Sequence, residues 1–241
     1  MNEAAYQAMR AMQGRHWWYQ GRQEVVANIL EQSVKSYDLK ILDLGSGFGG
    51  MVSLLRPLGV VDAVEPNVAA WEYLRRESIV EVYSDVESIP PERKENFDLV
   101  TMFDVMEHIE DDYGIAKKVY TELLISGGTF LLTVPANPWM WGFHDEINHH
   151  YRRYTPARLR SVLEDAGFII ERQTFFMKRL FPIAVAGRLM AKLRRGSSPG
   201  LSTPPRLLNR LLYLIFHGEV KHLRSKDYSY GLSLLCVARK P

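Results

Sequence analysis

A glycine-rich stretch at residues 45–50 is the first part of this sequence that could bind a ligand. It reads GSGFGG, and it lies between an apolar strand-like run and a helix-like run. Glycines let the backbone approach a ligand closely, and the start of a helix offers free N–H groups. Glu65 ends the next strand-like run, twenty residues after Gly45. An acid at this place can accept hydrogen bonds from ribose hydroxyls, so the pattern predicts a nucleoside-type ligand.

The spacing of the glycines leaves the type of ligand open. Gly45, Gly47 and Gly50 satisfy the dinucleotide pattern G-x-G-x-x-G, and G-x-G-x-G is satisfied as well. Asp43 lies just before the first glycine, where a carboxylate suits an ammonium group better than a pyrophosphate. Asp85 follows the third strand-like run, where its carboxylate can accept a hydrogen bond from the amino group of an adenine. These two acids favour an adenosine-containing ligand that also carries an amino group.

Histidines in two regions could act as a base. His108 follows the fourth strand-like run, and the carboxyl ends of strands face the ligand in open α/β sheets. Asp145 could orient either His144 or His150, and a histidine has a pKa suited to taking a proton from a hydroxyl. Ordinary hydrogen bonds that hold a loop are the structural alternative. No zinc-ligand spacing is present, and we expect no metal.

The hydrophobic pattern predicts an α/β fold. Short apolar runs alternate with helix-like stretches, which is typical of a parallel sheet. We expect strands at 40–44, 60–64, 80–83, 97–103, 129–134, 168–176 and 231–238. Helices are expected at 3–13, 22–32, 50–56, 68–75, 113–124, 155–166, 182–193 and 205–223, with an irregular loop at 135–154.

The same pattern divides the chain into four parts. Residues 1–38 form an N-terminal helical cap, 39–177 the core, 178–228 a basic helical insertion or lid, and 229–241 the last strand of the core. The sequence has 241 residues, 46% of them hydrophobic, 24% charged and one cysteine, which excludes disordered and disulfide-rich classes. No apolar run reaches the roughly 18 residues of a membrane span. We therefore expect a cytoplasmic protein, and peripheral contact with a membrane is left open.

The basic insertion carries most of the charge asymmetry. Residues 178–226 contain eleven lysines and arginines and one acid, although the net charge of the whole chain is +2. Amphipathic basic helices can lie on anionic membranes, cover a lipid-linked substrate, or simply pack on the sheet as a cap. No groove-reading or base-stacking motif accompanies the bases, so a nucleic-acid partner is not expected. The oligomeric state is not indicated.

Six short motifs carry a family resemblance. They are ILDLGSGFG at 41–49, VEPN at 64–67, SDV at 84–86, FDLV at 97–100, DVMEHI at 104–109 and GGTF at 127–130. In this order and spacing the chain resembles the class I S-adenosylmethionine-dependent methyltransferases over residues 40–135. The resemblance implies a Rossmann-like, mostly parallel seven-stranded sheet with an antiparallel last strand and helices on both faces. The helical insertion at 178–228 precedes that last strand.

The resemblance also assigns roles in binding S-adenosylmethionine. Its methionine part would lie on Asp43 and the loop residues Gly45, Ser46, Gly47 and Gly49. Glu65 would bind the ribose, Asp85 and Val86 the adenine, and Phe103 and Asp104 would line the floor of the pocket. Trp18 could close over the cofactor, with Arg22 near its carboxylate.

A narrower resemblance covers the flanking motifs HWWYQGR at 16–22 and HYRRYT at 150–155. They are similar to signatures of bacterial methyltransferases linked to surface polysaccharides, although His149 replaces the glycine usual before that histidine. This resemblance implies methyl transfer to a small-molecule or glycan hydroxyl, and a lipid-linked acceptor is included. The catalytic candidates are His150 of this motif, with His108 and Asp145 from their positions in the sequence. A quinone-like or other lipid acceptor is the alternative within the class. An NAD-dependent oxidoreductase and a silent cofactor-binding module are the alternatives outside it.

Overall fold

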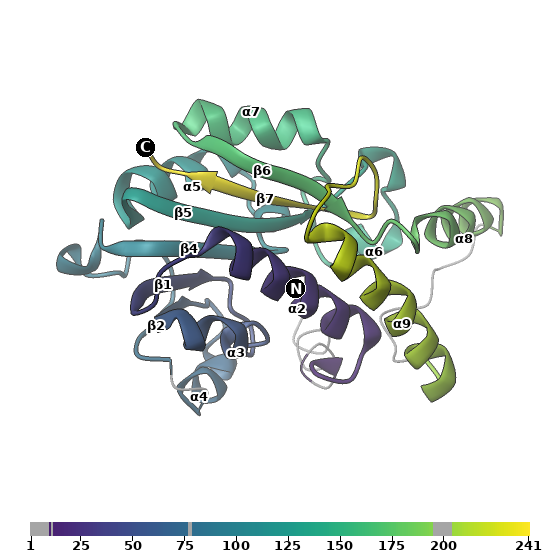
Figure 1. The fold of residues 1–241 in the computed structure, drawn as a ribbon, viewed down its shortest axis with the longest axis horizontal. Coiled ribbons are helices and arrows are strands. Elements are labelled where there is room, and N and C mark those ends of the chain that lie inside the picture. Colours follow the sequence, from purple (N-terminus) through teal and green to yellow (C-terminus); the bar gives the residue numbers. More distant parts are fainter. Residues whose placement is uncertain (1–9, 11, 77–78, 195–203) are drawn as a thin grey trace.

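The computed structural model describes residues 10, 12–76, 79–194 and 204–241, and its centre is a seven-stranded sheet (Figure 1). The strand order is β3-β2-β1-β4-β5-β7-β6. The strands are β1 Leu39–Leu44, β2 Gly59–Val64, β3 Val82–Tyr83, β4 Phe97–Phe103, β5 Leu124–Pro135, β6 Ile169–Phe176 and β7 Ser233–Arg239. β7 runs antiparallel to both of its neighbours, and the other pairs are parallel. The expected fold class, with its antiparallel last strand, is confirmed.

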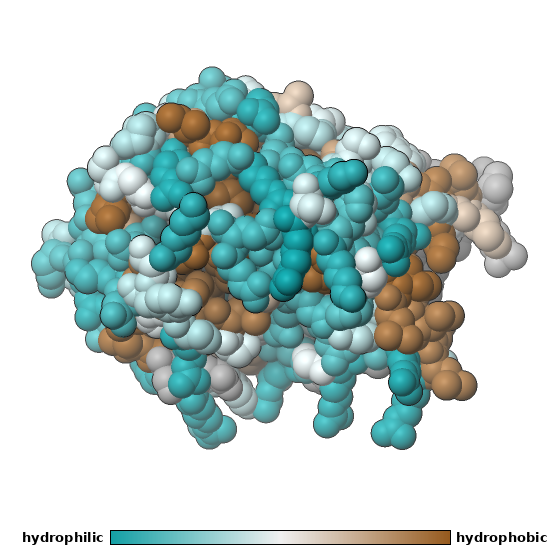
Figure 2. Space-filling view, viewed as in Figure 1, coloured by the Kyte–Doolittle hydropathy of each residue, from teal (hydrophilic) through white to brown (hydrophobic). Residues whose placement is uncertain are grey.

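The helices pack around this sheet and at one end of it (Figure 1). They are α2 Trp17–Ser33, α3 Val52–Leu55, α4 Val68–Arg76, α5 Asp112–Lys118, α6 Phe143–Ile147, α7 Pro156–Ala166, α8 Phe181–Arg194 and α9 Arg206–Leu223. Thr155 accepts a hydrogen bond from the Arg158 N–H at the start of α7, and Gly167 ends the helix in the left-handed region, as expected. Apolar residues group on the surface over α8 and α9 (Figure 2).

Local differences from the expected elements have local causes. The third strand shrinks to two residues, and the expected helix at 50–56 becomes the short α3 followed by a 3-10 turn at Arg56–Leu58. The expected helix at 113–124 ends in a π-turn at Val119–Leu123. The expected irregular loop at 135–154 contains α6, because the Asp145 carboxylate accepts the N–H of Gly142 and starts a helix there. The expected helix at 3–13 falls mostly outside the described residues.

The N-terminal helix α2 begins earlier than the apolar pattern predicts. His16 accepts a hydrogen bond from the Trp18 N–H through Nδ1, so the aromatic cluster forms the first turn of α2. α2 packs along α9 (Figure 1), and Gly21 lies directly against the ring of Phe216. Phe216 is fully buried, and its ring stacks on the ring of Phe176 with the two ring centres 6.2 Å apart. The close approach of α2 to α9 therefore depends on a glycine.

We expect Gly21→Ala to destabilise the protein despite the better helix propensity of alanine. The added Cβ would lie 2.1 Å from Phe216 Cδ1, so the buried ring must move. Overpacking of this kind costs about 1–3 kcal/mol. The control is Gly187→Ala in α8, where no atom lies within 4 Å of the added Cβ and alanine should cost nothing or stabilise by up to about 1 kcal/mol. Urea unfolding of both variants measures the difference, and equal effects would contradict this packing.

Candidate functional site

The glycine loop turns sharply between β1 and α3 at the carboxyl end of the sheet. Gly45 has a φ of 74°, which L side chains rarely adopt, and a Cβ added there would lie 2.4 Å from a side-chain carbon of Val105. The loop therefore needs glycine both for its backbone and for its packing on the turn after β4. The Ser46 hydroxyl donates to the carbonyl of Asp43 at 2.8 Å, so it closes the turn.

Asp43 lies buried beneath this loop. Its Oδ1 accepts a hydrogen bond from the Thr101 hydroxyl on β4 at 2.7 Å. Burial raises the pKa of Asp43 to about 6, against the opposing effect of hydrogen bonds from Thr101 and Ser46. A nearby cation favours the ionised form of a buried carboxylate, and the role expected for Asp43, which is to bind an ammonium group, needs that form.

Glu65 connects the end of β2 to the glycine loop. Its carboxylate accepts the N–H of Gly47 at 2.7 Å and the N–H of Asn67 at 2.8 Å. Asp85 lies beyond the end of β3, where its carboxylate accepts the Ser88 N–H at 2.7 Å. Neighbouring Val86 is buried. The acids at the ends of β1, β2 and β3 thus follow one another along one edge of the sheet, in the order that a nucleoside would need.

Arg22 reaches this edge from α2. It forms an ion pair with Asp104, which follows Phe103 and has a φ of 56°. The Arg22 guanidinium lies 4.4 Å from the centre of the Trp18 ring, and its buried Nε has no hydrogen-bond partner among the described residues. A guanidinium with an unused donor, close enough to buried Asp43 to influence its pKa, fits a ligand that carries both a carboxylate and an ammonium group. Of the neighbouring aromatic residues, Trp17 packs on Phe216 of α9 instead.

Asp145 and His150 form a hydrogen-bonded pair in the segment after β5. His150 Nδ1 lies 3.0 Å from Asp145 Oδ1, and Arg153 Nε donates to the same oxygen at 2.7 Å. Burial alone would raise the pKa of Asp145, but the bonds from His150, Arg153 and Gly142 hold it well below its usual range. An ionised carboxylate can only accept, so Nδ1 carries the proton and Nε2 is free to accept one. His144 makes no such bond and contacts Asn148 instead.

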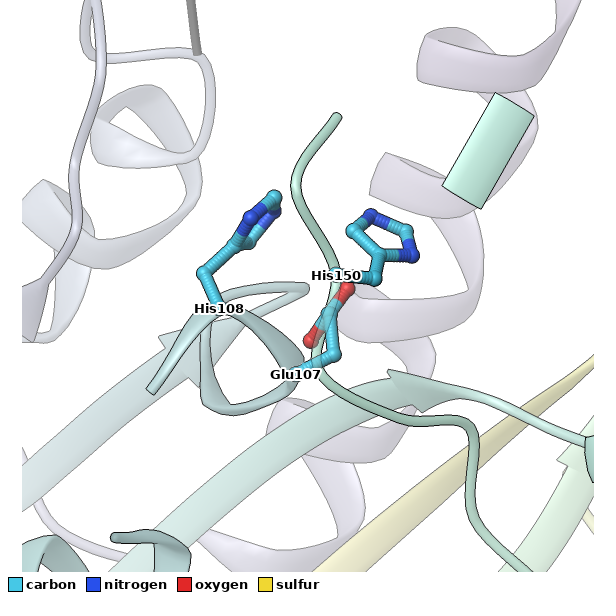
Figure 3. Close-up of side chains that lie close together, drawn as sticks. All are labelled: Glu107, His108 and His150. Atoms are coloured by element: carbon cyan, nitrogen blue, oxygen red, sulfur yellow. The ribbon is translucent and has the colours of Figure 1, made fainter. Parts of the chain in front are cut away.

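Glu107 and His108, in the turn after β4, lie beside His150 (Figure 3). The rings of His108 and His150 lie 4.6 Å apart, and one ligand-type atom from each of Glu107, His108 and His150 lies within 4.8 Å of the others. Burial raises the pKa of the Glu107 carboxyl well above its usual range, and burial lowers the pKa of His108 to about 4. His108 is therefore uncharged at neutral pH, and burial favours the uncharged form of Glu107. Their atoms could also hold a cation, and the expected absence of a metal stays a prediction.

Two features of the site escape the sequence analysis. Glu107 is buried with one carboxyl oxygen unpartnered among the described residues, and only its position after β4 signals this. Arg153 supports Asp145 and also donates to the Ala136 carbonyl at 3.1 Å. Arg152 donates to the carbonyls of Ile109 and Glu110, and the Tyr154 hydroxyl to Asp112. These side chains hold the segment in place through their hydrogen bonds.

The comparisons with known proteins fit this geometry. A family model described as a methyltransferase domain matches residues 10–173. This chain belongs to the methyltransferase domain family. The ubiquinone biosynthesis O-methyltransferase of Azotobacter vinelandii is 33% identical over 119 residues, which cover 46% of this chain and 51% of that protein. The chain thus spans about half the length of the curated relatives it matches.

Solved structures share the fold at low identity. One belongs to the complex between the Haloferax volcanii Trm112 methyltransferase activator and a methyltransferase, with a TM-score of 0.65, 18% identity, and coverage of 99% of this chain and 95% of that one. Another is the Haemonchus contortus phosphoethanolamine N-methyltransferase 2 in complex with S-adenosyl-L-methionine, with a TM-score of 0.58, 17% identity, and coverage of 90% and 52%. Membership of the family and the residues at the sheet edge support S-adenosylmethionine as the cofactor.

We expect the affinity for S-adenosylhomocysteine to fall below about pH 6, because an ammonium group pairs with ionised Asp43 and its pKa is raised to about 6. The loss approaches tenfold per pH unit at most, since one proton must leave for binding. Asp43→Asn should weaken binding about 10–100-fold at pH 8 and remove this pH dependence.

Calorimetric titration between pH 5 and pH 8 measures both effects. Asp98→Asn is the matched control, because Asp98 lies at the opposite end of β4 and caps the Lys40 N–H there. NAD serves as the control ligand. An unchanged pH dependence in Asp43→Asn would show that this carboxylate does not face the amino group.

Proposed function

We propose that this protein is an S-adenosylmethionine-dependent methyltransferase that acts on a hydroxyl of a small-molecule or glycan acceptor. The observation that carries the choice of a hydroxyl is the Asp145–His150 pair, with Nδ1 and Oδ1 3.0 Å apart. A hydroxyl acceptor must lose a proton during transfer, and an oriented neutral histidine is the usual group to take it. The pair lies next to the turn after β4, which also carries Asp104 of the cofactor pocket.

Residues at the sheet edge would hold the cofactor. Asp43 and Arg22 fit its amino and carboxylate groups, Glu65 its ribose, and Asp85 and Val86 its adenine. When bound, S-adenosylmethionine supplies a methyl group on a positively charged sulfur, which is a very good leaving group. The protein therefore has mainly to align the acceptor and to remove its proton.

His150 is the base in this proposal. Its Nε2 takes the proton of the acceptor hydroxyl as the oxygen forms its bond to the methyl carbon. Asp145 stays ionised and stabilises the imidazolium that results, and Arg153 keeps the Asp145 carboxylate in position. His108 lies against the His150 ring and is itself uncharged, so it adds no positive charge that would oppose protonation of His150. His108 then shapes the pocket and contacts the acceptor.

A phenolic, quinone-type acceptor is the second candidate. The relatives named as ubiquinone biosynthesis O-methyltransferases favour it. Around the Asp145–His150 segment, Trp139 and Tyr151 expose large parts of their rings, and either ring can stack on a sugar or on a phenol. A lipid-linked form of either acceptor is compatible with these exposed rings.

We expect His150→Asn to lower kcat about 10²–10⁴-fold and to leave S-adenosylhomocysteine binding unchanged, because the variant loses the base and keeps the cofactor pocket. The assay follows release of S-adenosylhomocysteine with a panel of catechols and of glycosides with free hydroxyls. Mass spectrometry of the product then locates the methyl group.

His144→Asn is the control, since His144 lies in the same segment and its ring also meets the His150 ring, at 6.2 Å between centroids, but it makes no bond to the Asp145 carboxylate. It should retain most of the activity. Asp145→Asn should lower kcat and change its pH profile, because the tautomer of His150 is no longer fixed. Full activity in His150→Asn, or a product methylated on nitrogen, would exclude the proposed reaction.

A further inference from the structure

The outward face of α9 carries leucines instead of polar residues. Leu207, Leu211 and Leu214 recur at a spacing that places them on one side of a helix, and between 51% and 85% of each is exposed. The opposite side of α9 is the packed one, where Phe216 and Leu223 are buried. The sequence pattern suggests one broad apolar face for this helix, whereas the structure shows a buried stripe and an exposed stripe.

α8 shows the same arrangement. Ile183, Leu189 and Met190 are all about half exposed or more. Ile183 and Met190 are seven residues apart and share one side of the helix, and Leu189 lies about 100° around the helix from Met190. The inward side of α8 carries Phe181 and Arg188, which contact Trp139 and Asp145. We call the six exposed residues the α8–α9 face; apolar side chains gather at that end of the molecule in Figure 2.

Bases far outnumber acids in the segment that carries this face, and Glu24 and Glu31 of neighbouring α2 already pair with His217 and Arg224 of that segment. Residues 178–226 contain eleven bases and the single acid Glu219. Glu219 is fully buried and accepts the N–H groups of Lys178 and Arg179, so it presents no charge to the outside. Arg206, Arg210 and Lys221 lie along one flank of the leucine stripe. They are exposed and form no ion pair within the described part of the chain.

We propose that the α8–α9 face docks on the surface of a membrane that contains anionic phospholipids. A helix that lies in the membrane interface combines exposed apolar side chains with a row of basic ones. The apolar side chains enter the acyl region and the cations contact the anionic headgroups. A second copy of the chain would bring like charges together on this face. No helix in the described part of the chain could span a membrane.

Docking in this way would place the Asp145–His150 segment near the lipid surface. Arg188 on α8 lies 3.7 Å from the Asp145 carboxylate, and Phe181 packs on Trp139 with ring centres 6.1 Å apart. The helix that carries part of the α8–α9 face is therefore in contact with the proposed catalytic segment. The docking itself is independent of methyl transfer, because it is measured without cofactor or acceptor.

The experiment is flotation of the purified full chain with vesicles of phosphatidylcholine alone or with phosphatidylglycerol added. We expect binding to the anionic vesicles only, weakened in 0.5 M salt. Leu207→Ser/Leu211→Ser/Leu214→Ser should lower partitioning at least tenfold. Arg206→Gln/Arg210→Gln/Lys221→Gln should lower it by about fivefold for each base that meets the surface.

Matched controls change exposed residues elsewhere. Tyr37→Ser/Val68→Ser/Ile169→Ser removes exposed apolar side chains, and Lys35→Gln/Arg56→Gln/Arg75→Gln removes exposed bases. Both should float like the wild type. The proposal is overturned if the wild type does not bind anionic vesicles, or if the controls lose binding equally. It is also overturned if sedimentation velocity shows a dimer that the leucine variant dissociates, because a second copy then covers the face.

Discussion

Four carboxyl groups come together where β1, β2 and β4 end, and the pocket depends on how their charge is balanced. Asp43 and Glu65 lie under the glycine loop, and Asp104 and Glu107 lie in the turn after β4. Four ionised carboxylates in a mostly buried place would repel one another strongly, because little water is present to screen their charges. Burial opposes this charge, since it favours the protonated form of Glu107 and raises the pKa of Asp43 to about 6. Arg22 on α2 supplies a positive charge through its ion pair with Asp104.

This balance makes the N-terminal helix part of the proposed cofactor site. α2 carries Arg22 and Trp18 to the sheet edge, and α2 is held by α9 through the contact of Gly21 with Phe216. Tyr213 and His217 of α9 also bind Glu24 of α2, at 2.5 and 2.7 Å. A segment that the sequence presents as a basic insertion thus supports the helix that neutralises the pocket. The outward face of the same segment is free for another contact.

The sequence predicts what depends on short-range pattern. The alternation of apolar runs predicts where the strands lie and that the sheet is mainly parallel, whereas the antiparallel last strand follows only from the family resemblance. The glycine loop and Glu65 lie close together after β1 and β2, as their places in the sequence predict. The sequence leaves open whether Asp145 orients His144 or His150, because both histidines lie within five residues of it. The choice depends on α6, whose turn brings His150 and Arg153 to the carboxylate. Glu107 escapes notice since its chemistry comes from burial. The spacing of apolar residues along α9 also does not indicate which of its apolar stripes is buried, because that depends on where α2 packs.

The position of β7 has a consequence for the order in which the sheet can form during synthesis. β7 is the last of the seven strands in the chain, yet it lies between β5 and β6. While the ribosome is still making residues before 233, β6 has no strand beside it, and the edge of β5 is open along its length. The nascent domain therefore exposes two unpaired strand edges during this time, each able to pair with another chain. Insertion of a single strand closes both edges in one step, so this half of the sheet is completed only when β7 emerges.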